Sequence, residues 1–170
     1  NATLHPFIRN TVASMEFGPV LHNKRHNRTN DGGNIRRTSY TFQLATAVLF
    51  QNPIQMFAIA PNNLEDAPKV AIDFMKEVPT TWDEVQYIDG YPGKYCVIAR
   101  RHVDKWYVVG INATKETLKL KVNLPMFEGK QVFKYADDTD GDTQLEKVTI
   151  NKKGNTTLTI ATGGGVILTN

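Results

Sequence analysis

The sequence of 170 residues contains one cysteine, Cys96, so no disulfide bond can form within the chain. This cysteine lies in the apolar stretch 95–99, where we expect a small buried side chain. Long apolar runs are lacking too. The longest, such as residues 44–50, are far shorter than the roughly 20 residues of a membrane-spanning helix. We therefore expect no membrane span.

Common catalytic signatures are also missing. The sequence shows no Ser-His-Asp triad, no Cys-X-X-Cys pair and no glycine-rich loop that opens a helix. The glycine run 163–165 is therefore predicted to be a turn. The net charge is only +3 and the basic residues are scattered, except in residues 24–37, so nucleic acid is not an expected partner. Binding through 24–37 remains an alternative, which predicts an affinity that depends strongly on salt.

The pattern that is present changes once, near Pro79. Before it, a strand is predicted at 13–21, a helix at 35–51, a strand at 54–60 and a helix over 66–77. The 35–51 helix is apolar nearly all round in its second half, which indicates burial on more than one side. Alternation of strands and helices is typical of a parallel sheet or barrel. Two strands cannot close such a sheet, so partner strands are expected outside this sequence.

After Pro79 the sequence reads as short strands separated by turns, with almost no helix signal. Leu118, Leu120 and Val122 alternate with lysines, which indicates one buried and one solvated face. Short strands at this spacing favour an antiparallel β-sandwich of about eight strands. The predicted strands are 85–91, 94–101, 105–112, 117–122, 131–136, 145–150, 157–161 and 166–169.

Two clusters raise the question of a metal site. The acidic run 137–142 offers carboxylates of the kind that bind calcium. However, Ala136 occupies a position where the calcium-loop pattern needs an acid, and no glutamate stands at the twelfth position of that pattern. We expect a solvated hairpin turn there. His22 and His26 share a basic loop without the helix and carboxylate that metal ligands at this spacing favour. No metal ligand is therefore predicted in this sequence.

Three residues are candidates for the wall of a substrate pocket. Glu16 lies inside an apolar strand, where it either faces outward or is hydrogen-bonded near a site, and both interpretations stay open. Gln55, in the second strand, raises the same question. In a barrel, the loop that follows a strand lies on the active-site face, so His22 would border substrate.

The order of several segments resembles glycoside hydrolase family 97. Residues 13–19 resemble that family's Gly-Pro-Met-Asp-Tyr-Thr-Pro strand, and residues 5–10 resemble its Leu-Pro-Phe-Thr-Arg-Asn. Further matches in family order are 43–45, 51–56, 78–84, 92–95, 98–101 and 106–110. The sequence departs from the family at Glu16, which replaces aspartate, at Gly18, which replaces threonine, at His5, where an apolar residue is usual, and in the basic loop 22–34.

This resemblance implies the last βαβα portion of a (β/α)8 barrel in residues 1–79 and a C-terminal sandwich in 80–170. It implies an exo-acting α-glucosidase or α-galactosidase of the bacterial periplasm or a secreted one, with calcium in the parent enzyme. The catalytic carboxylates and calcium ligands would lie upstream, so the chain alone is expected to be inactive. Its expected partners are the oligosaccharide substrate of the parent enzyme, the missing N-terminal part, and other copies of itself.

One alternative has no catalysis. The chain would be a freestanding carbohydrate-binding or interaction module, with an aromatic platform for sugar on the sandwich. The aromatic candidates are Tyr91, Tyr95, Trp106 and Tyr107. Core packing at alternating strand positions is the competing interpretation of the same side chains.

Overall fold

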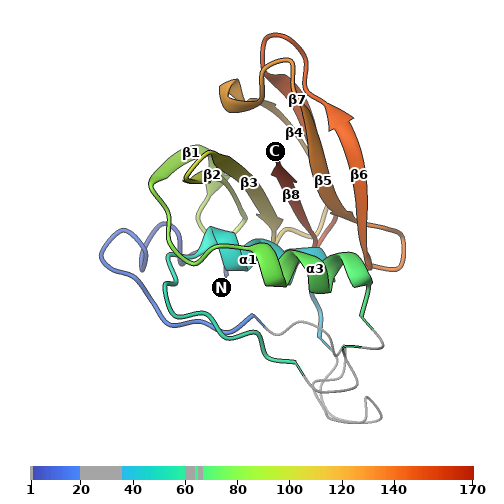
Figure 1. Cartoon of the computed structure of the whole chain (residues 1–170). Helices are drawn as coiled ribbons and strands as arrows, with labels where there is room; N and C mark the ends of the chain where they lie inside the picture. Colours follow the sequence, from blue (N-terminus) through green and yellow to red (C-terminus); the bar gives the residue numbers. More distant parts are fainter. Residues whose placement is uncertain (1, 20–35, 60–63, 65–66) are drawn as a thin grey trace.

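The structure, a computed structural model, describes residues 2–19, 36–59, 64 and 67–170. Its regular elements are two helices, a short 3₁₀ turn and eight strands in the described residues (Figure 1). The helices are α1 (Tyr40–Leu49) and α3 (Lys69–Glu77), and the 3₁₀ turn is η1 (Pro125–Phe127). The strands are β1 (Glu84–Tyr91), β2 (Tyr95–His102), β3 (Lys105–Asn112), β4 (Leu118–Asn123), β5 (Gln131–Asp137), β6 (Thr143–Thr149), β7 (Asn155–Ile160) and β8 (Gly165–Thr169).

The strands form two antiparallel sheets. The larger has six strands in the order β1-β2-β3-β8-β5-β6, and β4 pairs with β7 in the smaller one. The chain therefore inserts its last strand, β8, between β3 and β5. The predicted antiparallel β-sandwich of about eight strands is confirmed. None of the described helices is long and apolar enough to cross a bilayer.

The central strands β2, β3 and β8 of the six-stranded sheet are buried on both faces, and each face has its own core. Side chains alternate along a strand, so neighbours such as Val97 and Ile98 on β2 enter different cores. On one face Ile98 and Val109 pack against α1, in what we call the helix-side core. On the other face Val97 packs against β4, β7 and η1. The molecule is thus layered as helix, large sheet and small sheet.

Helix α1 lies enclosed between the large sheet and the N-terminal segments. The Ser39 hydroxyl caps it by accepting a hydrogen bond from the Phe42 N–H at 3.0 Å. Every residue of α1 except Gln43 is buried, which confirms the predicted burial on more than one side. A Cβ on Gly165 of β8 would lie 2.6 Å from the Thr41 carbonyl oxygen. The helix start therefore touches the sheet backbone directly, which only glycine permits.

The barrel portion predicted for residues 1–79 is not evident in this chain. Where strands were predicted at 13–21 and 54–60, the described residues form no regular strand and contain an isolated parallel bridge between Phe17 and Gln55. A parallel ladder needs further strands on its flanks, and the described residues supply none beside this bridge. The helix predicted at 35–51 is shorter, as α1, because Phe50 is already extended. The helix predicted over 66–77 begins at Lys69, and Asp66 lies outside the described residues.

Candidate functional site

Two extended segments, 13–19 and 51–59, lie against the far side of α1 and are held by one side chain. The amide of Asn52 donates to the Phe17 carbonyl at 2.6 Å and accepts from the Phe17 N–H at 3.1 Å. Backbone bonds from Met15 to Gln51 and from Ala58 to Pro19 extend the contact. The side chain of the buried Asn52 thus pairs with both the backbone N–H and the carbonyl of Phe17, as a neighbouring strand would.

The predicted pocket-wall residues Glu16 and Gln55 lie on opposite faces of this pair of segments. Phe17 and Phe57 pack into the helix-side core, so Gln55, the bridge partner of Phe17, faces the same way. Glu16 alternates with Phe17 and is exposed, on the side of Ile54 and Met56. His22 lies outside the described residues. The pocket-wall role of the three residues stays a prediction.

The side-chain amide of Gln55 is buried without a hydrogen-bond partner. Neither its Nε2 nor its Oε1 finds one within the described part of the chain, although both atoms are inaccessible to solvent. Buried polar groups in proteins are almost always paired. A polar group that could pair with the Gln55 amide is therefore missing from the described residues around it.

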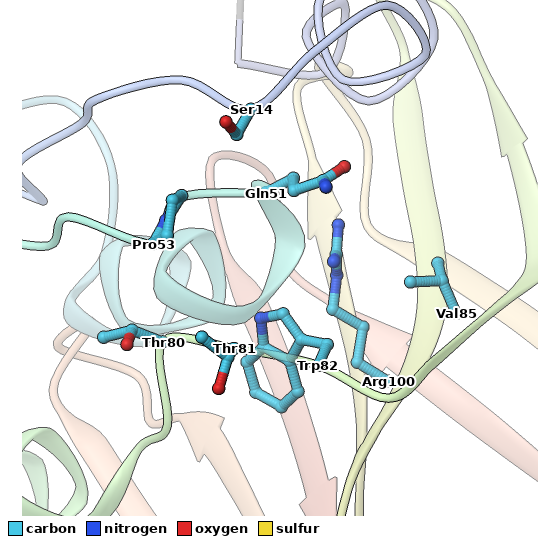
Figure 2. A pocket seen from close by; sticks show the side chains of 8 residues that line it. All are labelled: Ser14, Gln51, Pro53, Thr80, Thr81, Trp82, Val85 and Arg100. Carbon is cyan, nitrogen blue, oxygen red and sulfur yellow. The ribbon is translucent and has the colours of Figure 1, made fainter.

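A cavity of about 280 Å³ opens between residue 14, the end of α1, the segment 80–82 and the β1–β2 edge (Figure 2). Ser14, Thr80 and Thr81 give it hydroxyl groups, and Trp82 forms part of its wall. Arg100 of β2 rises beside Trp82 with its guanidinium toward Gln51 in Figure 2. The guanidinium carbon lies 5.9 Å from the centre of the indole ring. Burial lowers the pKa of Arg100 to about 10, so its side chain is still charged at neutral pH.

The acidic run 137–142 forms the hairpin connection between β5 and β6. The Asp138 carboxylate accepts hydrogen bonds from the N–H groups of Asp140 and Asp142 and from the Gln144 amide. The hydrogen bond from Gln144 is the main reason that the pKa of Asp138 is lowered. These contacts are those of a turn held by its own aspartate. The described residues contain no group of three or more His, Cys, Asp or Glu side chains placed to hold a metal ion.

The four aromatic side chains proposed as a sugar platform do not share a surface. Tyr107 is buried in the helix-side core, whereas Tyr95 and Trp106 pack against the other core. Only Tyr91 is well exposed, with Lys94 over its ring at 4.7 Å. Packing in the two cores therefore accounts for three of the four.

The sequence prediction missed Arg100, Trp82 and Asn52. Asn52 looked like a helix stop, because it precedes Pro53, and its reach to Phe17 spans 35 residues of sequence. The signal for Arg100 is its place at the end of the apolar run 96–99 on β2. A charged residue that continues a buried strand pattern is costly to bury, and this justifies a search for its partner.

Sequence comparison identifies the family. The family model described as "Glycosyl-hydrolase 97 C-terminal, oligomerisation" matches residues 81–169. A retaining alpha-galactosidase of Bacteroides thetaiotaomicron is 35% identical over 133 residues, which are 74% of this chain and 20% of that protein. The chain thus spans about a fifth of the length of this relative.

Solved structures show the same fold. A structure titled as a beta-arabinopyranosidase superposes with a TM-score of 0.97 and 58% sequence identity, covering 100% of this chain and 27% of that one. A glycoside hydrolase family 97 enzyme of Pseudoalteromonas sp. strain K8, in complex with panose, superposes with a TM-score of 0.79 at 23% identity. It covers 99% of this chain and 28% of that one, and at this identity it shows the fold alone. The chain therefore belongs to glycoside hydrolase family 97, and its residues 81–169 match the C-terminal, oligomerisation region of that family.

Proposed function

We propose that this chain is the C-terminal part of an exo-acting glycosidase that hydrolyses terminal α-galactosyl or β-L-arabinopyranosyl linkages. The observation that carries the proposal is the 58% identity with a beta-arabinopyranosidase over the whole chain, beside the similarity to a retaining alpha-galactosidase. The two linkages present the same ring stereochemistry, since L-arabinopyranose corresponds to D-galactopyranose without its hydroxymethyl group. One pocket can therefore accept both sugars, and the α-glucosyl linkage differs from them at the 4-hydroxyl.

In this proposal residues 1–79 supply the last strands and helices of a (β/α)8 barrel, and residues 80–170 are the sandwich beside it. The exposed apolar side chains support it. Ile54 is 65% and Met56 is 69% exposed, on the face turned away from α1. In a barrel that face points inward and is filled by side chains of the other strands. The helix-side face is already covered by α1, as it is in a barrel.

Glu16 shares the inward face, so we propose that it lines the substrate pocket, with His22 in the loop that follows. Gln55 would support the wall from the helix side. Its side-chain amide, which has no hydrogen-bond partner among the described residues, would bond to a polar group of the rest of the polypeptide. Glycoside hydrolysis uses a pair of carboxylates across the scissile bond. The proposal places that pair outside this chain, which makes the chain inactive by itself.

Calcium and cellular location are proposed for the whole enzyme only. The described residues offer no ligand set that fits calcium, so no step is assigned to the ion here. We propose that it is held elsewhere in the polypeptide and that the enzyme works in the periplasm or outside the cell. Loss of activity with a chelator, restored by calcium, would test the first point, and cell fractionation would test the second.

The substrate proposal is tested with the full-length enzyme and three p-nitrophenyl glycosides. We expect kcat/KM for the α-D-galactoside and the β-L-arabinopyranoside to exceed that for the α-D-glucoside by about 100-fold or more, because a misplaced hydroxyl leaves polar groups of the pocket unpaired. A preference for the glucoside would overturn the proposal. The 170-residue chain alone should hydrolyse none of the three, and hydrolysis by it would contradict the placement of the carboxylates.

The role of Glu16 is tested by Glu16→Gln in the full-length enzyme. We expect kcat/KM to fall about tenfold or more while the thermal midpoint stays within about 2 °C, because an exposed side chain contributes little to stability. Glu128→Gln, an exposed glutamate at the end of η1, is the matched control and should change neither quantity. Equal, small effects of both variants would remove Glu16 from the pocket wall.

A further inference from the structure

Arg100 is a buried cation that has no counter-charge among the described residues. Its side chain is on β2, the residue is 4% exposed, and its Nη2 donates to the Leu49 carbonyl at 3.3 Å. Its Nε finds no acceptor within the described residues. A buried charge is normally paired, because desolvation of an unpaired ion is expensive. The Nε–H of Arg100 therefore lacks a hydrogen-bond acceptor among the described residues.

Space for such an acceptor lies beside the Arg100 side chain. A cavity of about 280 Å³ next to Trp82 and a second one of about 390 Å³ share the lining residues Gln51, Val85 and Arg100. Of the aspartates and glutamates that the structure describes, none lines either cavity. The Trp82 indole N–H, in the wall of the first cavity, is buried and unpaired as well.

The second cavity is mostly apolar, apart from Arg100, Gln51 and two residues of the N-terminal segment. Phe7, Leu49 and Ile98 contribute to its lining, together with Tyr87 at its rim. Asn10 also lines it, and its Oδ1 is buried without a donor. The two cavities thus share the Arg100 cation. The second cavity adds an apolar lining, and the wall of the first adds the Trp82 indole, whose N–H finds no partner among the described residues.

We propose that this Arg100 cavity binds a carboxylate group whose short carbon chain lies against the apolar lining. A planar carboxylate matches the donor edge of a guanidinium. A phosphate suits the site less well, since there is one cation and half of the lining is apolar. The carboxylate comes either from a free small organic acid or from an aspartate or glutamate of the rest of the polypeptide. The inference does not depend on the proposed function.

The test uses propionate as the probe and the two tryptophans of the chain as reporters. In a ¹H–¹⁵N correlation spectrum of the 170-residue chain, at constant ionic strength, the Trp82 indole resonance should shift saturably with propionate. Trp106 packs against the other core, so its resonance is an internal control and should not move. Propionamide, which has the same shape without the charge, should leave both resonances in place.

Two variants assign the effect to Arg100. Arg100→Met should raise the Kd for propionate at least tenfold, whereas Arg101→Met should not change it, because Arg101 pairs with Glu84 outside the cavities. If Arg100→Met does not fold, Trp82→Phe keeps an aromatic ring and removes the indole N–H. In that variant the Kd is read from the Arg100 side-chain Nε–H resonance, and it should rise several-fold. An unmoved Trp82 resonance up to about 100 mM propionate, or an equal shift with propionamide or in Arg100→Met, would overturn the proposal.

The full-length enzyme distinguishes the two sources. If the natural ligand is a free acid, propionate also shifts Trp82 in the full-length enzyme. If a side chain of the polypeptide fills the cavity, Trp82 already resonates at the bound position there and propionate has no effect. This comparison distinguishes the two sources only if the isolated chain binds propionate through Arg100.

Discussion

At the scale of single residues, Asp137 joins three elements through one carboxylate. Its Oδ1 accepts the Thr41 N–H at the start of α1 at 3.2 Å, and its Oδ2 accepts the Gly165 N–H of β8 at 2.9 Å. Asp137 itself ends β5. Burial raises the pKa of this carboxyl, and the hydrogen bonds from Gly165, Ser39 and Thr41 offset the rise only in part.

The raised pKa predicts a pH dependence of stability. The folded state holds the Asp137 proton more tightly than the unfolded state, whose pKa is about 3.9. The free energy of unfolding should therefore receive a contribution that decreases as pH rises from about 3.9 through the folded pKa. Asp137→Asn should remove this slope and also lower stability, because one backbone N–H loses its acceptor. Urea unfolding at a series of pH values measures both.

The neighbouring Asp138 supplies the control for this prediction. Its pKa is lowered by Gln144, so its contribution has the opposite sign, present above the unfolded pKa and lost as pH falls. Asp138→Asn should therefore leave the Asp137 slope in place. The interpretation would be wrong if Asp137→Asn and Asp138→Asn changed the pH profile in the same direction.

Residues such as Asp137 and Arg100 explain why sequence indicates a site only in part. Asp137 directly follows the predicted strand 131–136, and Arg100 is the next-to-last residue of the predicted strand 94–101, positions at which a charged residue is ordinarily solvated. Their burial arises from α1 packing over them from about 50 to 95 positions away in sequence. A local pattern does not contain that information, whereas Glu16 was noticed because it interrupts an apolar strand pattern on its own.

At the scale of elements, Asn52 fixes the segment 13–19 to the end of α1. Asn52→Ala would leave the N–H and the carbonyl of Phe17 without partners. We expect a loss of about 2 kcal/mol in the free energy of unfolding, from two partly buried groups left unpaired. Urea unfolding gives the loss, and hydrogen exchange of the Phe17 amide should accelerate.

Asn52→Asp refines the same experiment. A carboxylate still accepts the Phe17 N–H but cannot donate to the Phe17 carbonyl, so protection of the amide should be kept while stability falls. If Asn52→Ala cost under about 0.5 kcal/mol, the segment would be held by its phenylalanine packing instead, with Phe17 and Phe50 in edge contact at 4.7 Å.

The strands of the sandwich could be predicted well because their signal is local. Alternation such as that of 118–122, together with the turn residues between strands, indicates where each strand lies and which of its faces is buried. The pairing order could not be predicted in this way, since β8 inserts between β3 and β5 only through contacts across the chain. For the same reason the described residues of the strands predicted at 13–21 and 54–60 form isolated bridging instead of a regular ladder.

At the scale of the whole molecule, the exposed apolar face of 54–56 predicts self-association. The family model carries the description of an oligomerisation domain, and this face adds a surface that favours contact. Sedimentation of the 170-residue chain should show association that increases with concentration. The double variant Ile54→Lys with Met56→Lys should suppress it, because charges on both positions repel a second copy.

Val103→Lys is the matched control, since Val103 is an exposed apolar residue in the β2–β3 turn and does not belong to the segment 54–56. It should leave the association unchanged. Association that survives the double variant would assign self-contact to another part of the sandwich, and a monomer at about 100 μM would contradict the prediction altogether.

The enclosure of α1 also bears on how such a region can be inherited. One face of the large sheet is covered by α1 and by residues that precede Pro79, while the other is covered by β4, β7 and η1. A recombination event that moved residues 80–170 alone into another gene would carry a sheet with one bare apolar face. Evolutionary transfer should therefore favour junctions upstream of α1, so that helix and sandwich travel as one heritable unit.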